Sequence, residues 1–210
     1  MMLTVYAVPI SLYCAKLRIV LRHKQLDWEE LAPPGGYGSD EYKAIVPAGN
    51  LPALRHDGAL ISDSEAIAEY LNEAFPEPDM LPGNALERAK IRELSRFHDT
   101  RLEPALRALF PMISEKGRQS GPFEKAWHQL ETRLDQVTPL LPQSSGALTL
   151  ADCGLAISGT WIEVLADHFD QPNPIHPRLA EYLHALQDHA AVSTELHDYR
   201  PKLTAWLANQ

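Results

Sequence analysis

The sequence predicts two domains, an α/β domain in the order βαβαββα and an all-helical domain after it. In the first third of the chain, short β-forming runs alternate with segments whose apolar residues recur at helical spacing. Prolines and a glycine between Pro76 and Gly83 interrupt this pattern, and helical spacing without a convincing strand continues beyond them. We therefore expect domains over residues 1–77 and 84–210, joined by a linker over 78–83.

The chain opens with a strand and a helix. Residues 3–7 are a short apolar run rich in β-forming residues, and Pro9 ends it. A helix is predicted over 12–25, because Leu17, Val20 and their neighbours recur at helical spacing.

The rest of the first domain contains three more strands and two more helices. Residues 28–31 are predicted to form a strand, and a brief helix follows around Tyr42. Strands over 53–56 and 59–61 flank Asp57-Gly58, which is the strongest short hairpin signal in the chain. A third helix begins at Asp63 or Ser64 and runs towards Phe75.

The second domain is predicted to be a bundle around one buried helix. Thr149 and Asp152 are typical of a helix N-terminus, and the apolar run after Leu150 predicts the helix at the centre of the bundle. The expected helices are residues 84–110, bent or broken at Pro104, and residues 123–141, 150–165, 177–187 and 201–207.

Composition and charge exclude some classes of function. The chain has 210 residues, a formal charge of −9 and 45% apolar residues, which argues against nucleic-acid binding and favours an ordinary globular protein. Cys14 and Cys153 lie far apart without the spacing of a disulfide framework, which favours a reducing cytoplasm. No signal peptide and no apolar run of about 20 residues is found, so we expect no membrane contact.

Ser11 precedes the first helix and is a candidate for thiol chemistry. A thiol with a pKa near ~8.5 is only slightly ionised at neutral pH, and lowering the pKa by about two units requires roughly 2.7 kcal/mol. One charge-assisted hydrogen bond from a serine hydroxyl, together with the free amides of a helix end, supplies that order of energy. Ser11 would then donate to a bound thiolate. An alternative is that Ser11 only caps the helix, which is typical of a serine at this position. Cys14 is either a core residue or itself the reactive thiol.

Two further segments are candidates for binding a peptide. A cis bond before Pro52 would free the backbone of Leu51 to pair with a ligand as an added strand. Ser64 at a helix start would bind a ligand carboxylate, and Asp63 would bind an ammonium group. An acid and a serine before a helix are also typical of a capping pair.

Together these segments resemble the cytosolic glutathione transferases over essentially the whole chain. The phrases that carry the resemblance are Ser11–Cys14, Val46–Leu54, Asp63–Leu71 and Leu148–Asp152. It implies a thioredoxin-like first domain with a mixed four-stranded sheet, and a serine-type, theta- or zeta-like bacterial-type member. It also implies that Pro52 is the family's cis-proline, that Leu51 contacts the glutathione backbone, and that Asp63 and Ser64 bind the γ-glutamyl group.

The resemblance implies a glutathione transferase, with reduced glutathione as co-substrate, a small apolar electrophile and no metal. It further implies a cytoplasmic homodimer, with Ser11 stabilising the thiolate. We expect His98, Arg101 and Leu102 to line the pocket for the second substrate, because they fall on one side of a helix. Three alternatives stay open: a thiol transferase or reductase that depends on Cys14, a zeta-like glutathione-dependent isomerase, and a non-catalytic module that binds proteins.

Overall fold

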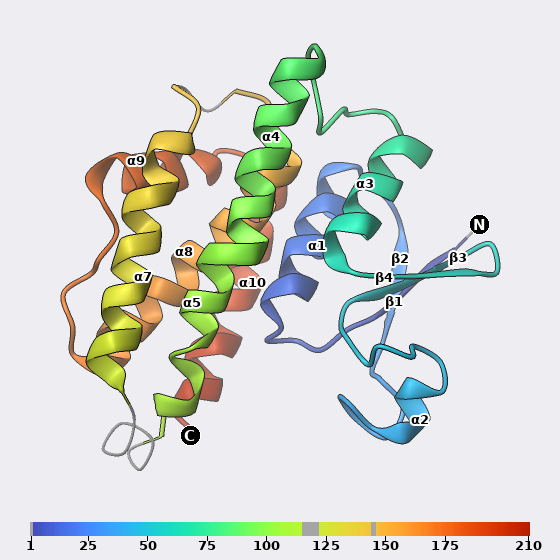
Figure 1. Cartoon of the computed structure of the whole chain (residues 1–210). Helices are drawn as coiled ribbons and strands as arrows, with labels where there is room; N and C mark the ends of the chain where they lie inside the picture. Colours follow the sequence, from blue (N-terminus) through green and yellow to red (C-terminus); the bar gives the residue numbers. More distant parts are fainter. Residues whose placement is uncertain (1, 115–121, 144–145) are drawn as a thin grey trace. The chain divides into compact units, whose positions relative to one another are not determined.

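The computed structural model of the chain describes residues 2–114, 122–143 and 146–210 (Figure 1). The chain divides into two compact units between Met80 and Leu81. This boundary lies within residues 78–83, the segment that the sequence analysis assigns to the linker.

The first unit contains a mixed sheet with the strand order β2-β1-β3-β4. Strand β1 pairs in parallel with β2 and antiparallel with β3, and β3 pairs antiparallel with β4. The strands are β1 (Leu3–Tyr6), β2 (Trp28–Leu31), β3 (Ala53–His56) and β4 (Ala59–Ser62). The predicted mixed four-stranded sheet is confirmed.

The hairpin between β3 and β4 turns at the predicted dipeptide. Asp57 and Gly58 have φ angles of 48° and 81°. Positive φ at both central residues is what a two-residue hairpin turn of the favoured type requires, and Asp-Gly supplies it at low cost.

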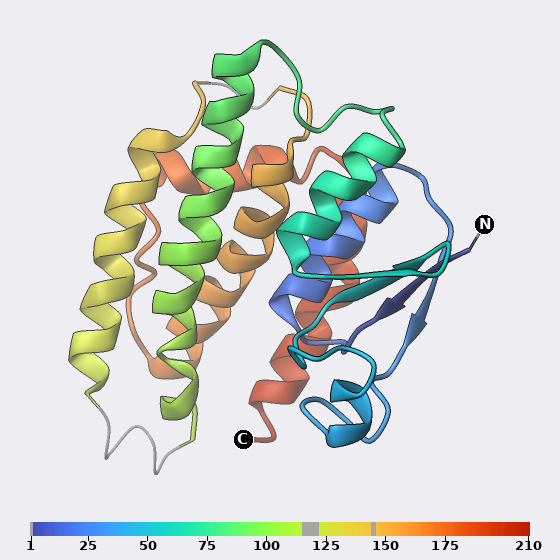
Figure 2. The same ribbon diagram turned by 45° about the vertical axis from the view of Figure 1, so that its right-hand side comes forward.

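Two helices cover one face of this sheet, as Figure 2 shows. They are α1 (Leu12–His23) and α3 (Ser64–Ala74), and they pack against each other. Their apolar stripes are fully buried, as helical spacing predicts, and include Leu17, Val20, Ile67 and Leu71. The short helix α2 (Asp40–Lys43) lies in the connection between β2 and β3.

The second unit contains helices and, among its described residues, no strand. Its helices are α4 (Ala85–Phe97), a π-helix (His98–Leu102), α5 (Glu103–Arg107), a 3₁₀ turn (Phe110–Met112), α7 (Phe123–Val137), a second 3₁₀ turn (Thr138–Leu140), α8 (Leu150–Phe169), α9 (Pro177–Leu186) and α10 (Ala190–Leu207). Within the described residues, no helix is long and apolar enough to cross a bilayer.

The predicted interruption near Pro104 is the π-helix. Pro104 has no N–H to donate to the carbonyl four residues earlier, and its ring crowds that carbonyl. The wider turn over His98–Leu102 accommodates both effects, after which the α-helix resumes at Glu103.

Helix α8 is the buried centre of the second unit, as predicted. It contacts α4, α5, α9 and α10, and nearly all of its residues are buried. At its start, the Thr149 backbone N–H donates to Asp152 Oδ2 at 2.7 Å, so the predicted capping box is present.

The prediction that the last helix begins at Pro201 is wrong. Helix α10 begins at Ala190, and Pro201 lies inside it. A proline usually marks the first turn of a helix, which is why the sequence suggested that start. Here Val192, Tyr199 and Leu203 are buried on both sides of the proline, and this packing outweighs the lost hydrogen bond.

Candidate active site

The register of the sheet brings the predicted site residues to one edge. Tyr6 pairs with Ala53, and Ala53 pairs with Ser62, so these residues form one row across β1, β3 and β4. The segments that follow Tyr6, precede Ala53 and follow Ser62 therefore meet at this edge. Two strand spacings span about 10 Å. An extended tripeptide has the same length, roughly 10 Å.

Ser11 lies at the first of these segments and caps α1. Its backbone is extended, with φ −67° and ψ 123°, and its Oγ accepts a hydrogen bond from the Cys14 backbone N–H at 3.3 Å. A hydroxyl that accepts one hydrogen bond can still donate its own proton. The capping role is confirmed, and the geometry is compatible with donation to a bound sulfur.

Cys14 is enclosed in the core of the first unit. Its exposed fraction is 1%, and burial raises the pKa of its thiol, with hydrogen bonding to Ser11 opposing that rise. Desolvation outweighs the favourable neighbours, which favours the reading of Cys14 as a core residue over that of a reactive thiol. Cys14 and Cys153 are both free thiols.

The second segment contains the predicted cis bond between Leu51 and Pro52. Leu51 precedes the first residue of β3 that pairs in the sheet, so its backbone lies outside the ladder. Tyr42 holds this turn, because its hydroxyl donates to the Asn50 carbonyl at 2.8 Å. Burial raises the pKa of Tyr42, which keeps the hydroxyl protonated as a donor.

Asn50 is a candidate site residue that sequence reasoning missed. Its side-chain oxygen Oδ1 is buried and has no hydrogen-bond partner among the described residues. An unsatisfied buried acceptor costs about 1–3 kcal/mol, and such groups are expected to meet a ligand or water. Its position directly before Leu51 and Pro52 was the only signal in the sequence.

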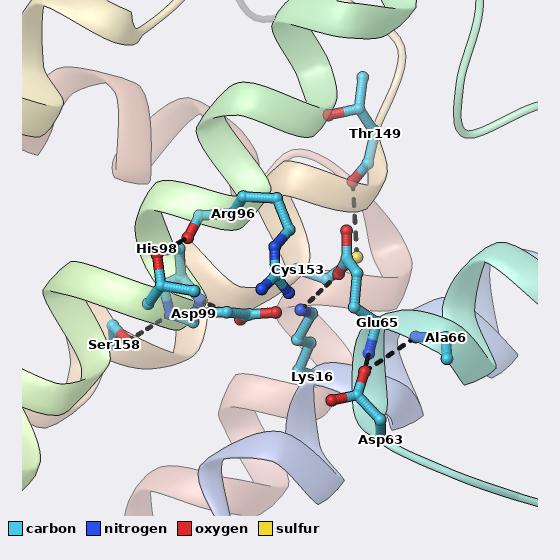
Figure 3. A network of polar contacts seen from close by, with 11 residues as sticks. Lys16, Asp63, Glu65, Ala66, Arg96, His98, Asp99, Thr149, Cys153 and Ser158 are labelled. Atoms are coloured by element: carbon cyan, nitrogen blue, oxygen red, sulfur yellow. Dashed lines mark hydrogen bonds and ion pairs between the residues drawn. The ribbon is translucent and has the colours of Figure 1, made fainter.

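The third segment caps α3 with a strained residue. Asp63 has φ 108° and ψ 122°, a conformation that costs a residue other than glycine about 1–3 kcal/mol. Its Oδ1 accepts from the backbone N–H groups of Glu65 and Ala66, both at 3.0 Å (Figure 3). Ser64 is the first residue of the helix and is buried, with an exposed fraction of 7%. The capping role of Asp63 is confirmed.

The three residues predicted to line a substrate pocket have different environments within the second unit. His98 and Leu102 are buried, with exposed fractions of 0% and 1%, whereas Arg101 is exposed. The ring nitrogens of His98 lie 2.8 Å from Asp99 Oδ1 and 2.8 Å from Ser158 Oγ (Figure 3). These bonds favour a structural role for His98, and the pocket stays a prediction.

His98 contacts both Ser158 and Asp99, as the histidine of a hydrolase triad contacts its serine and its acid, but here the serine is not accessible to a substrate. Ser158 is fully buried and lies inside α8, where the backbone N–H groups bond within the helix. A nucleophilic serine needs free N–H donors for an oxyanion and an open approach for the substrate. The trio therefore links the π-helix to α8. Among the described residues, no cluster of three or more His, Cys, Asp or Glu side chains could hold a metal ion.

Comparisons with known proteins identify the family. A model of the family described as glutathione S-transferase, N-terminal domain, matches residues 5–79. "Glutathione S-transferase 1" of Dianthus caryophyllus is 30% identical over 156 residues, which cover 72% of this chain and 71% of that protein. The chain belongs to the glutathione S-transferase family.

A second relative and a solved structure are also similar to this chain. "Probable maleylacetoacetate isomerase 1" of Drosophila melanogaster is 27% identical over 65% of this chain, and the matched chain spans only 57% of that protein's length. A delta-class glutathione transferase of Nilaparvata lugens superposes with a TM-score of 0.85 over 99% of both chains, at 19% identity. This structural likeness supports the fold, and the thioredoxin-like assignment of the first unit is confirmed.

Proposed function

We propose that this protein is a glutathione transferase that binds reduced glutathione and transfers it to a small apolar electrophile. The observation that carries the proposal is the single row of the sheet at whose edge Ser11, Leu51 and Ser64 are brought together. This row has the length of a tripeptide, and beside it the buried Oδ1 of Asn50 has no partner among the described residues.

In the proposed complex, each part of glutathione meets a matching group. The sulfur lies at Ser11, and the cysteinyl backbone pairs with the free backbone of Leu51 as an added strand. The γ-glutamyl carboxylate meets Ser64 at the positive end of α3, and its ammonium group meets Asp63. An N–H group of the ligand donates to Asn50 Oδ1 and satisfies it.

Ser11 then acts as a hydrogen-bond donor to the thiolate. The thiol proton leaves to solvent, and the thiolate attacks the electrophilic carbon. A C–S bond forms while the leaving group departs with its electron pair. Stabilising the thiolate by roughly 2.7 kcal/mol lowers the thiol pKa by about two units. The thiolate is then the main form at neutral pH. Proximity supplies the remaining acceleration.

A zeta-like isomerase is the second candidate, and the relative named as a maleylacetoacetate isomerase favours it. In that reaction the same thiolate would add to a carbon–carbon double bond and leave again after rotation about the resulting single bond. Glutathione would be regenerated in every turnover. The two candidates are separated by following free thiol: conjugation consumes one thiol per product, and isomerisation consumes none.

The test compares two serines that both cap helices. Ser11 caps α1, and Ser39 caps α2 by accepting from the Tyr42 N–H at 3.0 Å. With a chloronitrobenzene as electrophile, Ser11→Ala is expected to reduce kcat/KM at pH 7 about 25-fold, because the thiolate fraction falls, and to move the pH profile up by about two units. Ser39→Ala is expected to leave both unchanged.

Three outcomes would reject parts of the proposal. Full activity with the same pH profile in Ser11→Ala would reject the role of Ser11. A mixed disulfide between Cys14 and glutathione, with activity lost in Cys14→Ser and kept in Ser11→Ala, would favour the thiol transferase. Failure of the wild type to bind millimolar glutathione by calorimetry would favour a non-catalytic module.

The assembly and location follow from family membership as proposals. We expect a homodimer in the cytoplasm, as is typical of the family. Sedimentation equilibrium gives the mass in solution, and a mass of one 23.5 kDa chain at micromolar concentration would reject the dimer.

A further inference from the structure

A buried ion pair joins the two helices whose N-termini form the site. Lys16 Nζ lies 2.7 Å from Glu65 Oε2, and the two side chains are 1% and 8% exposed. Figure 3 shows both side chains, with Lys16 rising from α1 to meet Glu65 on α3. The two residues are 49 positions apart in sequence, so the contact is tertiary.

The pair is directly connected to the site on the α3 side. Glu65 follows Ser64, and its backbone N–H donates to Asp63 Oδ1 at 3.0 Å. Asp63 holds its strained φ of 108°, and such a conformation persists only where its surroundings fix it. Lys16 therefore binds the residue that helps to hold Asp63 in place.

On the α1 side, Lys16 lies just over one turn from the cap. It is five residues after Ser11, which corresponds to about 7.5 Å along the helix axis. Ser11 itself is fixed to the first turn by the hydrogen bond from Cys14 N–H. A movement of Lys16 along or around α1 would therefore carry Ser11 with it.

Stability alone is a poor explanation for such a pair. Buried ion pairs are often replaced by apolar residues without loss of stability, because desolvation offsets their attraction. They do fix geometry, since a charge-assisted hydrogen bond is short and directional, whereas apolar contacts between helices are not. Strand β3 also separates β1 from β4, so the sheet gives no direct pairing between the strands that precede α1 and α3.

We propose that Lys16 and Glu65 are positioning residues that set the separation between Ser11 and Ser64. This inference rests on the proposed function, because the separation matters only to a ligand that contacts both serines at once. Glutathione does so through its sulfur and its γ-glutamyl carboxylate. Productive geometry requires such groups to be held within about 0.5 Å.

The experiment replaces the pair by apolar residues of similar size. In Lys16→Met/Glu65→Leu, the dissociation constant for glutathione is expected to rise about tenfold, while the melting temperature of the ligand-free protein stays within a few degrees. The pKa of the bound thiol, followed by thiolate absorbance, is expected to rise. The matched control is Lys90→Met/Glu93→Leu, an exposed pair at 2.6 Å on α4, for which no change in binding is expected.

A second measurement separates positioning from general destabilisation. Ser64→Ala removes the hydroxyl contact to the γ-glutamyl carboxylate, so binding should depend less on the separation between Ser11 and Ser64. Glu65→Gln is then expected to weaken binding less than threefold in the Ser64→Ala background, compared with about tenfold in the wild type. Equal effects in both backgrounds would overturn the inference.

The remaining outcomes also decide the question. Unchanged affinity and thiol pKa in the double variant would overturn the role of the pair and leave the proposed function intact. A double variant that fails to fold would show that the pair serves stability, and would overturn the positioning role. Absence of glutathione binding by the wild type would overturn the proposed function, and the inference with it.

Discussion

The candidate site and the interior of the second unit use polar side chains in opposite ways. In the first unit, the polar groups of the candidate site lie at the ends of helices and strands, as Ser11 and Asp63 do. In the second unit, polar groups in the interior bond to one another, as Trp161 Nε1 does to Tyr199 Oη at 2.7 Å. The hydroxyl of Ser11 lies at a helix end, whereas the hydroxyl of Ser158, inside α8, lies 2.8 Å from His98 Nε2 in the interior.

The candidate site and the second unit also differ in the energetic cost of their buried polar groups. The candidate site keeps two local costs, namely the buried Oδ1 of Asn50, which a ligand donor would satisfy, and the strained backbone of Asp63. The second unit places its buried polar groups in satisfied pairs, such as Tyr182 Oη with Asp152 Oδ1 at 2.5 Å. Substitutions in the second unit should therefore reduce stability, and substitutions at the sheet edge should reduce binding.

The largest expected effect is at Trp161. This side chain is 2% exposed, stacks on Phe110 with ring centroids 4.6 Å apart, and donates to Tyr199. Trp161→Ala is expected to lower the free energy of unfolding by about 3–5 kcal/mol, because it leaves a large cavity. Urea denaturation measures this. Leu86→Ala, at a position 70% exposed, is the control and should change the value by less than about 0.5 kcal/mol.

The second prediction concerns Asn50, where stability and binding should change in opposite directions. Asn50→Leu removes an unsatisfied buried acceptor, so the ligand-free protein should be unchanged or up to about 1 kcal/mol more stable. Its glutathione affinity should fall about tenfold, which is about 1.4 kcal/mol. Calorimetry and thermal melting measure the two quantities. Loss of stability without loss of affinity would assign Asn50 to the fold and weaken the contrast between the units.

The third prediction separates strain from capping at Asp63. Asp63→Ala loses the cap and keeps an unfavourable φ of 108°, whereas Asp63→Gly loses the cap and relieves the strain. The glycine variant should therefore be more stable than the alanine variant by about 1 kcal/mol. Equal melting curves for the two variants would show that this backbone conformation is not strained.

The smallest effect is the pH dependence that arises from Cys14. Burial raises the pKa of this thiol in the folded state, whereas in the unfolded chain it ionises near ~8.5. Its contribution to stability is complete below that pH and decreases as the pH rises towards the folded pKa, by at most about 1.4 kcal/mol per pH unit. Between pH 7.5 and 9.5, the wild type should lose about 1 kcal/mol more than Cys14→Ala. Parallel curves would contradict the assigned burial.

Local signals in the sequence predicted much of the first unit. The Asp57-Gly58 turn and the cap at Ser11 each depend on one or two residues and their neighbours, whereas the cis bond before Pro52 was expected from the family resemblance. The apolar run after Leu150 predicted a buried helix for the same reason, since its composition leaves no polar face.

Features that depend on tertiary contacts were not predictable. The partnership of Lys16 with Glu65 joins distant positions, and nothing in either local sequence marks it. Asn50 became informative only when its oxygen was found buried without a partner among the described residues. Helix α10 continues through Pro201 because buried residues on both sides stabilise it, which local propensity does not register.

The hydrogen bonds of Lys24 bear on where a fragment containing only the first unit should end. Its ammonium group donates to the carbonyls of Phe75 and Pro78, at 2.7 and 2.9 Å, and so closes the segment after α3 against the end of α1. Met80 is held as well, because its N–H donates to Asn72 Oδ1 at 2.9 Å. A fragment that ends at Ala74 would lack both carbonyls that accept from Lys24, whereas a fragment that ends at Met80 would keep these hydrogen bonds.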